Sequence, residues 1–486
     1  MKTNLLKFVM GILLPVTLVM TSCEDDDPKS SLTGLTSFSF VASDAIPGLE
    51  NVEFKIDQTA YTISNEAELP YMSDVSKLVA DFEAIENTTV TVGTAEQISG
   101  STENDFSSPL NYVVTAEDGV TQITYQVTVN VSQVNPEGVS WVKEQAAVTS
   151  DPYETVASVY FNGKYRTVYG SVANNVASSK YMTSTDGVSW TEVSVDAASF
   201  PVGSRHEMIV FNNKLYICGY LTITDPWGIG YFIPGNLKEI WESEDGETFT
   251  KLSSTYTFDG DKVGSALYAL DNKLWVVGGN TLGFGNPDGA KPADAEFAPP
   301  SGLSNRIHNT ADMATWDEAE TDVLQEEALR RYAATTVHNN KMYMIGGQLK
   351  DATLSSDVWS SADGKTWTLV GTGGFTARMK AAVVSYDSKL WLIGGQTGLG
   401  VCTAEMLVSE DDGATWTAPE EDALLPEEFT ARAGHSAYLD ENNKLWIVGG
   451  YSAQTKVVTD PDTGEDETVE ETTPLNDVWS GKLNKL

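Results

Sequence analysis

Cysteine, histidine and basic residues are all scarce in this chain of 486 residues. With 3 cysteines a disulfide framework is excluded, and with 4 histidines few ligands remain for a transition metal. The 30 basic residues stand against 69 acidic ones, so the formal net charge is -39. Such a surface repels phosphate backbones, which argues against nucleic acid as a partner.

Long apolar runs are missing too, except near the first residue. Two lysines precede an apolar run over residues 8–20 that contains Pro15 and leads into small residues. A membrane-spanning helix needs about 20 apolar residues, so this shorter run predicts a signal peptide over residues 1–22. The stretch "MTSC" at 20–23 resembles a bacterial lipobox. That resemblance implies cleavage before Cys23 and a lipid, such as palmitate, on that residue.

An acidic, polar segment follows the predicted lipidation site. Residues 24–31 read "EDDDPKSS" and offer nothing apolar to pack. The cluster resembles the export signal that sends lipoproteins of certain Gram-negative bacteria to the outer face of the outer membrane; the alternative is a plain solvated spacer. We therefore expect residues 23–31 to be a lipidated tether and the protein to be anchored in the outer membrane, facing outside the cell.

Residues 32–134 carry short alternating runs that are typical of half-buried strands. They are rich in valine, threonine, tyrosine and phenylalanine, as in "LTSFSFV" at 35–41 and "VTQITYQVTVNV" at 120–131. About a hundred residues of this pattern predict a sandwich of two sheets. The segment is similar to the immunoglobulin-like modules of bacterial surface lipoproteins, and we expect it to act as a spacer without catalytic residues.

From residue 152 onward one unit returns about every fifty residues, which indicates a repeat architecture. Its clearest element is a second strand that follows a polar turn and ends on glycine. Six copies are present: "GKYRTVYG" (163–170), "NKLYICGY" (213–220), "NKLWVVGG" (272–279), "NKMYMIGG" (340–347), "SKLWLIGG" (388–395) and "NKLWIVGG" (443–450). Cys218 lies inside one of these apolar strands, so we expect a buried free thiol.

A tight turn follows the third strand in five of the six units. Five copies share an aspartate that can bind turn amides, mostly with a glycine that can take positive φ. They are "STDGVSW" (184–190), "SEDGETF" (243–249), "TADMATW" (310–316), "SADGKTW" (361–367) and "SEDDGATW" (409–416). The closing aromatic residue is expected to pack between neighbouring sheets.

The last unit is incomplete, and the missing strand lies at the other end of the repeat region. "NDVWSGKL" at 476–483 is a third strand after which the chain stops, while "EGVSW" at 137–141 precedes every complete copy and aligns with "DGVSW" at 186–190. We therefore predict that the strand around Trp141 pairs with the strand around Trp479. This splice would close a six-bladed β-propeller over residues 135–486 and leave no free sheet edge.

The double glycines and "RAGHSAYLDENNKLWIVGG" (432–450) resemble the kelch repeat of galactose-oxidase-like propellers. The aspartate turns resemble the Asp-box of sialidase propellers. Both motifs mark a fold and not a chemistry. The predicted fold class is thus all-β, a sandwich followed by a propeller, and the whole resembles an uncharacterised family of kelch-type surface lipoproteins.

Three long insertions, at 221–236, 280–304 and 452–474, fall between second and third strands. They share one face of the ring, here called the insertion face, while the aspartate turns lie on the opposite turn face. Loops of this length are usually functional or disordered. The splice enters from the turn face, so we expect the insertion face to point away from the membrane.

Two sets of candidate ligand-binding residues belong to the insertion face. The first, at the start of the innermost strands, would form a cationic funnel for a carboxylate or sulfate, although arginines of this kind can instead brace neighbouring blades. The second could stack on sugar rings or simply pack within its loop. The candidates are Lys262, Arg330, Arg378 and Arg432 in the first set, and Trp227, Tyr231 and Phe232 in the second.

Catalysis and metal binding find little support in the residues. A copper oxidase needs paired histidines, but His206, His308, His338 and His435 fall in different blades. The acidic loop 460–467 lacks the spacing of an EF-hand, so a solvated loop is favoured over a calcium site. We expect no cofactor and assign no catalytic residue.

The sequence thus predicts a non-catalytic surface binding module. Its partner would be a glycan or a protein such as an outer-membrane transporter. The alternative is a glycan-active enzyme, either a sialidase-like hydrolase or a sialic-acid mutarotase, which needs only an anion clamp and one placed acid or base.

Overall fold

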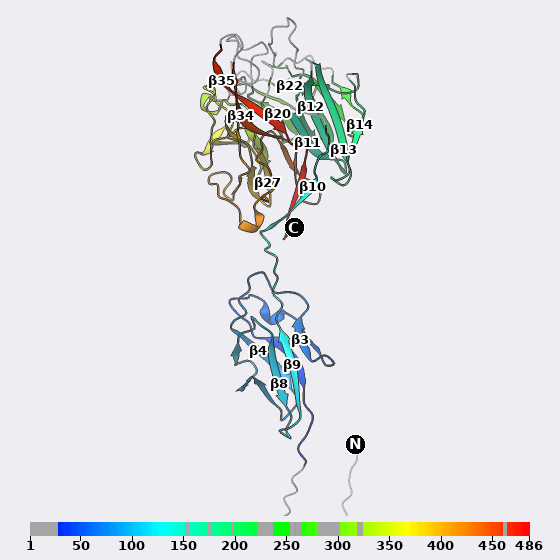
Figure 1. Ribbon diagram of the computed structural model, residues 1–486, viewed down its shortest axis with the longest axis vertical. Coiled ribbons are helices and arrows are strands. Elements are labelled where there is room, and N and C mark those ends of the chain that lie inside the picture. The colour runs from blue at the N-terminus through cyan, green and yellow to red at the C-terminus, as the bar shows by residue number, and fades with distance from the viewer. Residues whose placement is uncertain are drawn as a thin grey trace, which may run out of the picture. The chain divides into compact units, whose positions relative to one another are not determined.

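The computed structural model describes residues 28–150, 153, 155–173, 176–196, 198–203, 205–220, 237–252, 258, 262, 264–279, 302–317, 324–459 and 464–486. The chain divides into two compact units, Met1–Asn135 and Pro136–Leu486, which are described separately (Figure 1). Strands dominate both units, and the predicted all-β class is confirmed. In the described part of the chain, no helix has the length and apolar character needed to cross a membrane.

The first unit contains two sheets. The larger runs in the order β2-β3-β9-β8-β5-β6 and the smaller in the order β1-β4-β7, and β3 and β9 are the pair that runs parallel. The strands are β1 (Leu35–Phe40), β2 (Phe54–Asp57), β3 (Thr62–Asn65), β4 (Leu78–Ala84), β5 (Thr89–Val92), β6 (Ala95–Glu96), β7 (Glu103–Asn104), β8 (Leu110–Thr115) and β9 (Gln122–Thr128), with a short 3-10 helix at Leu49–Asn51.

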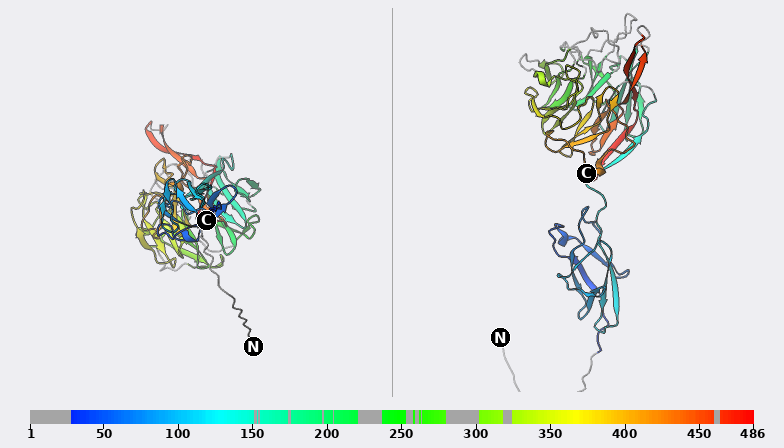
Figure 2. Two further views of the ribbon diagram at one scale, coloured as in Figure 1. Left: turned by 90° about the horizontal axis from the view of Figure 1, so that it is seen from below. Right: turned by 60° about the vertical axis from the view of Figure 1, so that its left-hand side comes forward.

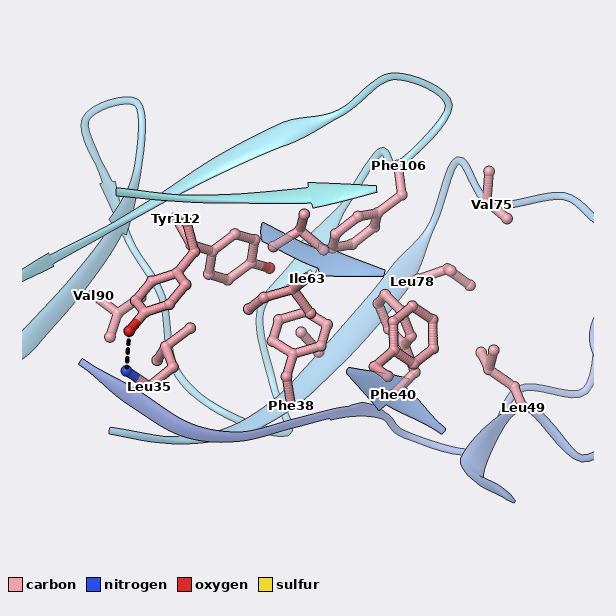
Figure 3. Packing of buried hydrophobic residues seen from close by; sticks show 14 of the residues in the cluster. Leu35, Phe38, Phe40, Leu49, Ile63, Val75, Leu78, Val90, Phe106 and Tyr112 are labelled. Carbon is pink, nitrogen blue, oxygen red and sulfur yellow. Dashed lines mark hydrogen bonds between the residues drawn. The ribbon is translucent and has the colours of Figure 1, made fainter. Parts of the chain in front are cut away.

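The core of this unit is aromatic (Figure 3). Alternate residues of β8 and β9 point inward, so Tyr112 and Tyr125 are fully buried. Edge-on contacts join Phe40 to Phe106, with ring centres 4.9 Å apart, and Phe38 to Tyr112, with ring centres 5.6 Å apart. Such contacts stabilise an aromatic core beyond the area they bury. The similarity to immunoglobulin-like modules stays a prediction.

The described residues of the second unit form six blade sheets around one axis. Blades 1 to 5 follow the chain, and blade 6 joins both ends of the unit in the order β10-β36-β33-β32. Their strands are β11 (Thr155–Phe161), β12 (Lys164–Ala173), β13 (Val176–Ser184) and β14 (Thr191–Val193); β15 (Arg205–Phe211), β16 (Lys214–Tyr220), β17 (Leu237–Ser243) and β18 (Thr250–Lys251); β19 (Ala266–Leu270), β20 (Lys273–Val277), β21 (Ile307–Thr310) and β22 (Trp316–Asp317); β23 (Ala334–His338), β24 (Lys341–Ile345), β25 (Val358–Ser361) and β26 (Thr368–Gly371); β27 (Ala382–Tyr386), β28 (Lys389–Ile393) and β31 (Met406–Ser409); β32 (Ser436–Leu439), β33 (Leu445–Val448), β36 (Val478–Leu483) and β10 (Val139–Gln145).

The ring is closed. Each innermost strand contacts that of the next blade, from β11 through β15, β19, β23 and β27 to β32, and β32 contacts β11. The double glycines allow this close packing, because a Cβ on Gly346 of blade 4 would lie 2.5 Å from the carbonyl oxygen of Arg378 in blade 5. The predicted six-bladed propeller is therefore confirmed.

The splice between the two ends of the propeller is also confirmed. Strand β10 pairs antiparallel with β36, with Trp141 opposite Gly481 and Lys143 opposite Trp479. The Trp141 indole N–H donates to the carbonyl of Ala423 at 3.1 Å. A Cβ on Gly481 would lie 2.5 Å from the Trp141 ring, so the glycine makes room for the indole.

The aspartate turns form as the spacing predicts. Asp186 Oδ1 accepts hydrogen bonds from the amides of Val188 at 2.8 Å and Ser189 at 2.7 Å. These bonds lower the pKa of Asp186 to about 2, because they favour its charged form. The same pattern recurs at Asp245, Asp312 and Asp363, and Asp411 accepts from the amide of Thr415, four residues on.

The insertion face carries two hairpins. The insertion at 452–474 belongs to the long hairpin of β34 (Tyr451–Thr459) and β35 (Asp466–Pro474), which projects from the ring (Figure 2). A smaller hairpin, β29 (Gln396–Gly398) with β30 (Val401–Cys402), contacts β34. The insertion at 221–236 and most of that at 280–304 lie outside the described residues.

Candidate functional site at the propeller axis

The four basic residues predicted to form a funnel are buried inside their own blades. Arg330 donates to the carbonyl of Gly346 at 2.9 Å, and Arg378 to that of Gly394 at 3.0 Å. Lys262 donates to the Ser304 hydroxyl at 2.7 Å. Burial lowers the pKa of Arg330 to about 10. These contacts satisfy the basic groups within the framework.

Arg432 makes the most complete set of hydrogen bonds within its blade. Its guanidinium binds both carboxylate oxygens of Asp477, at 2.7 and 3.0 Å, and the carbonyl of Gly449 at 3.0 Å. Burial alone would raise the pKa of Asp477, but the bonds from Arg432 and Trp479 outweigh it and lower that pKa. These side-chain contacts lie within one blade, whereas the alternative expected such arginines to brace neighbouring blades. We assign these four side chains to the framework of their own blades.

Bracing also reaches the neighbouring blade through the backbone. The amide of Gly347 in blade 4 donates to the carbonyl of Arg378 in blade 5 at 2.8 Å. The amide of Gly395 in blade 5 donates in the same way to Arg432 in blade 6, at 2.8 Å. Arg378 and Arg432 therefore each order their own blade with the side chain and the previous blade with the backbone carbonyl.

The residue two positions after each of the four basic residues lies where an innermost strand begins, a place here called the mouth of the axis. We name Gly264, Tyr332, Lys380 and Gly434 the axial belt, because they precede the innermost strands of blades 3 to 6 and bond to one another. The Tyr332 amide donates to Gly264 at 3.0 Å, the Lys380 amide to Tyr332 at 2.8 Å, and the Gly434 amide to Lys380 at 2.8 Å. The belt runs along the insertion face, where the innermost strands begin.

All four belt residues have a left-handed backbone, although two of them are not glycine. The φ angles are 71° at Gly264 and 63° at Gly434, but also 57° at Tyr332 and 54° at Lys380. A large side chain in this conformation costs about 1–3 kcal/mol, and such strain gathers at functional sites. Blades 4 and 5 thus carry side chains at a position that blades 3 and 6 fill with glycine.

The side chains at this mouth converge. Lys380 Nζ lies 4.9 Å from the Tyr332 ring centre and 5.2 Å from the Tyr451 ring centre, and it donates to the Tyr451 hydroxyl at 3.1 Å. From blade 2, Arg205 Nη1 donates to the Tyr332 hydroxyl at 3.2 Å. That bond joins blade 2 to blade 4 past the glycine of blade 3. We name Arg205, Tyr332, Lys380 and Tyr451 the axial cluster.

The two belt glycines make room for these aromatic rings. A Cβ on Gly264 would lie 2.7 Å from the Tyr332 ring, and one on Gly434 would lie 3.0 Å from the Tyr451 ring. Another cation is close, since the Arg331 guanidinium lies 5.1 Å from the Tyr332 ring centre. Tyr332 is therefore surrounded by three basic side chains in a strongly acidic protein.

A hydrogen-bond chain links the axial cluster to the hairpins of the insertion face. The Tyr451 hydroxyl donates to Gln396 Oε1 at 2.9 Å. The carboxylate of Glu470, on β35, accepts from the Gln396 side-chain amide and from the Gly400 backbone amide, the latter at 2.9 Å. Glu470 is thereby held at the junction of the two hairpins.

The histidines occupy framework positions. His206 and His435 directly follow the axial positions of blades 2 and 6, and both are buried. Burial lowers the pKa of His206 to about 4, and burial together with the charge of Arg432 lowers the pKa of His435 to about 3. His338 lies 3.3 Å from a carboxylate oxygen of Asp412, which belongs to an aspartate turn. Among the described residues, no three potential metal ligands form a group.

The remaining predicted site residues cannot be placed. Cys23, Trp227, Tyr231 and Phe232 lie outside the described residues, and so do residues 460–463 of the acidic loop. Lipid attachment at Cys23, ring stacking by the three aromatic residues and the solvated character of the acidic loop stay predictions. Cys218, in contrast, is a buried free thiol as expected.

The fold and the axial cluster define a β-propeller that carries a β-domain before it. Residues 31–129 match the family described as "Domain of unknown function (DUF6242) N-terminal domain", and residues 302–486 match the "DUF6242 beta propeller domain". The chain is therefore similar to that family in both units. No curated protein matches it.

The comparison with solved structures also found matches. One, titled "Structure of YjhT", is 13% identical, with a TM-score of 0.47, and the match covers 68% of this chain and 99% of that chain.

Proposed function

We propose that this protein is a surface lipoprotein whose propeller binds a glycan through the axial cluster, without catalysing a reaction on it. The observation that carries this proposal is the left-handed backbone of Tyr332 and Lys380 at a glycine position. Backbone strain of this kind persists where the side chain is needed. Here the side chains meet near the starts of the innermost strands.

The chemistry of the cluster suits binding. Tyrosine and arginine offer hydrogen-bond donors together with flat, weakly hydrated surfaces, and lysine adds a mobile charge. The cluster contains no carboxyl group and no imidazole, although its tyrosine and lysine side chains belong to the groups that can act as general acids or bases. A glycan, which presents many hydroxyl groups and some apolar ring faces, fits such a surface.

The lipid anchor is a further part of the proposal. It rests on the lipobox at residues 20–23 and on the acidic tether that follows. In cells grown with an alkyne-tagged palmitate, the wild-type chain should become labelled and the Cys23→Ala variant should not. Added protease should digest the wild-type chain on intact cells if it faces outward.

Glycan binding is tested with the full chain, purified in detergent. Retention on a glycan array without change in the bound sugar supports the proposal. Release of a shortened or isomerised sugar would support the enzyme alternative, and retention of no glycan would leave a protein partner, such as an outer-membrane transporter.

A further inference from the structure

We propose that the axial cluster selects ligands that carry a carboxylate, and that Lys380 is the residue that determines this selectivity. The inference rests on the proposed binding function and names the ligand class for the same site. It applies to acidic sugars that display a carboxylate beside hydroxyl groups.

Charge is the first argument. The whole chain carries a formal charge of -39, so a ligand with a carboxylate is repelled by most of its surface. At the axial mouth, however, Arg205, Arg331 and Lys380 gather around one tyrosine ring, at the distances given above. A local concentration of cations in an acidic surface attracts an anion to that place and to few others.

Geometry is the second argument. Arg205 is half-buried and reaches its partner hydroxyl past the belt glycine of blade 3. Lys380 is half-buried too, and its Nζ lies between two aromatic rings that hold it in place. The two basic groups therefore approach the mouth from different blades, an arrangement that suits a carboxylate with two oxygens.

Backbone strain is the third argument, and it singles out Lys380. Glycine is the unstrained choice at this belt position, as Gly264 and Gly434 show. A framework role for Lys380 would require that its contacts outweigh the strain. A lysine retained for its charge predicts the opposite: stability is unchanged or improved by glycine, while ligand selectivity is lost.

Glu470 connects the hairpins of the insertion face to the axial cluster through Gln396. Its carboxylate accepts hydrogen bonds from Gln396 and from the Gly400 amide. Gln396 also accepts from the Tyr451 hydroxyl, so a single residue connects Glu470 on the hairpin of β34 and β35 with the axial cluster. The hairpin therefore adjoins the proposed carboxylate site.

The experiment compares acidic sugars with their methyl esters, in which each carboxylate carries a methyl group and no charge. Trisaccharides of galacturonic acid and of glucuronic acid, each as the free acid and as the methyl ester, are titrated calorimetrically into the full chain. We expect at least one acid to bind at least about tenfold more tightly than its ester, as a charge-assisted hydrogen bond predicts, and the difference to shrink at high salt.

Variants then locate the selectivity. Lys380→Met removes the charge and keeps the backbone strain, whereas Lys380→Gly removes both. The matched control is Lys350→Gly, which removes one charge from an exposed turn of the insertion face. Both Lys380 variants should bind the acid and the ester equally, with Lys380→Gly melting at or above the wild-type temperature, while Lys350→Gly keeps the preference.

Several results would overturn the inference. These are equal or weaker binding of every acid relative to its ester, a preference that survives both Lys380 variants, or a preference that Lys350→Gly also abolishes. Neutral glycans retained on the array in the absence of acid selectivity would refute the inference and leave the proposed binding function standing. Retention of no glycan at all would refute both.

Discussion

Lys380 Nζ lies 4.9 Å above the ring of Tyr332, and both residues hold a left-handed backbone that the equivalent residues of blades 3 and 6 reach as glycine. The pair is joined by a backbone hydrogen bond of 2.8 Å between adjacent blades. The contact therefore combines a strained conformation with an attraction between a cation and an aromatic ring, and the two terms can be separated by substitution.

At position 332, glycine should be more stable than alanine. Tyr332→Ala loses the contacts with Lys380 and Arg205 and keeps the strain, whereas Tyr332→Gly loses the same contacts and relieves it. We expect the free energy of unfolding of Tyr332→Gly to be about 1 kcal/mol higher than that of Tyr332→Ala. Urea denaturation of both variants measures the difference. At an ordinary position alanine is the more stable residue, so equal stabilities would show that the backbone there is unstrained.

Removal of Arg432 should destabilise the propeller strongly. The change Arg432→Ala leaves the buried carboxylate of Asp477 without its bidentate partner, which costs about 3–5 kcal/mol. Urea denaturation of the variant measures that cost. The companion change Asp477→Asn keeps a hydrogen-bond acceptor and should cost less. A stable Arg432→Ala protein that has lost ligand binding would return Arg432 to the ligand site.

Acid should destabilise the propeller through its buried histidines. Because burial lowers the pKa of His206 to about 4, the unfolded chain binds a proton near pH 6.5 that the folded chain does not bind. Stability therefore falls as pH drops from about 6.5 toward 4, by about 1 kcal/mol per pH unit for such a histidine. Urea denaturation between pH 7 and 4.5 measures this slope.

The variant His206→Gln provides the control for the acid effect. It removes one titrating group from a buried position and should flatten the decline over the same pH range. Asp477 also makes stability fall with pH, at lower pH than His206. Because the pKa of Asp477 is lowered in the folded protein, its stabilising contribution is lost as pH falls through that folded-state pKa. A slope unaffected by His206→Gln would show that other groups dominate the acid response.

The splice should show a coupling between its two facing residues. Gly481→Ala places a Cβ about where the Trp141 ring lies, so it should destabilise the propeller by about 1–3 kcal/mol. In a Trp141→Ala background the same change should cost less than half as much, since the space is then open. Additive effects in this double-mutant cycle, measured by urea denaturation, would contradict the observed pairing.

The sequence determined the repeat, the strands, the turns and the closing pair. Alternation, turn chemistry and the leftover "EGVSW" are local patterns, and a strand shows its inward residues wherever it lies. The repeat, the strands and the turns follow from the sequence because each depends on neighbouring residues, and the closing pair follows from comparing the incomplete last unit with the fragment that precedes the first one. The length of the hairpin of β34 and β35 was missed, since its polar residues do not alternate clearly with apolar ones.

The tertiary structure decided which residues reach the axis. The arginines lie at the right end of the innermost strands, but their side chains turn into the blades and meet carbonyl groups there. Two residues later the left-handed backbone presents Tyr332 and Lys380 at the mouth instead. The sequence does contain a sign of this site, because Tyr332 and Lys380 stand where two other blades have Gly264 and Gly434. Its meaning depended on a backbone angle and on contacts between blades, which no single repeat contains.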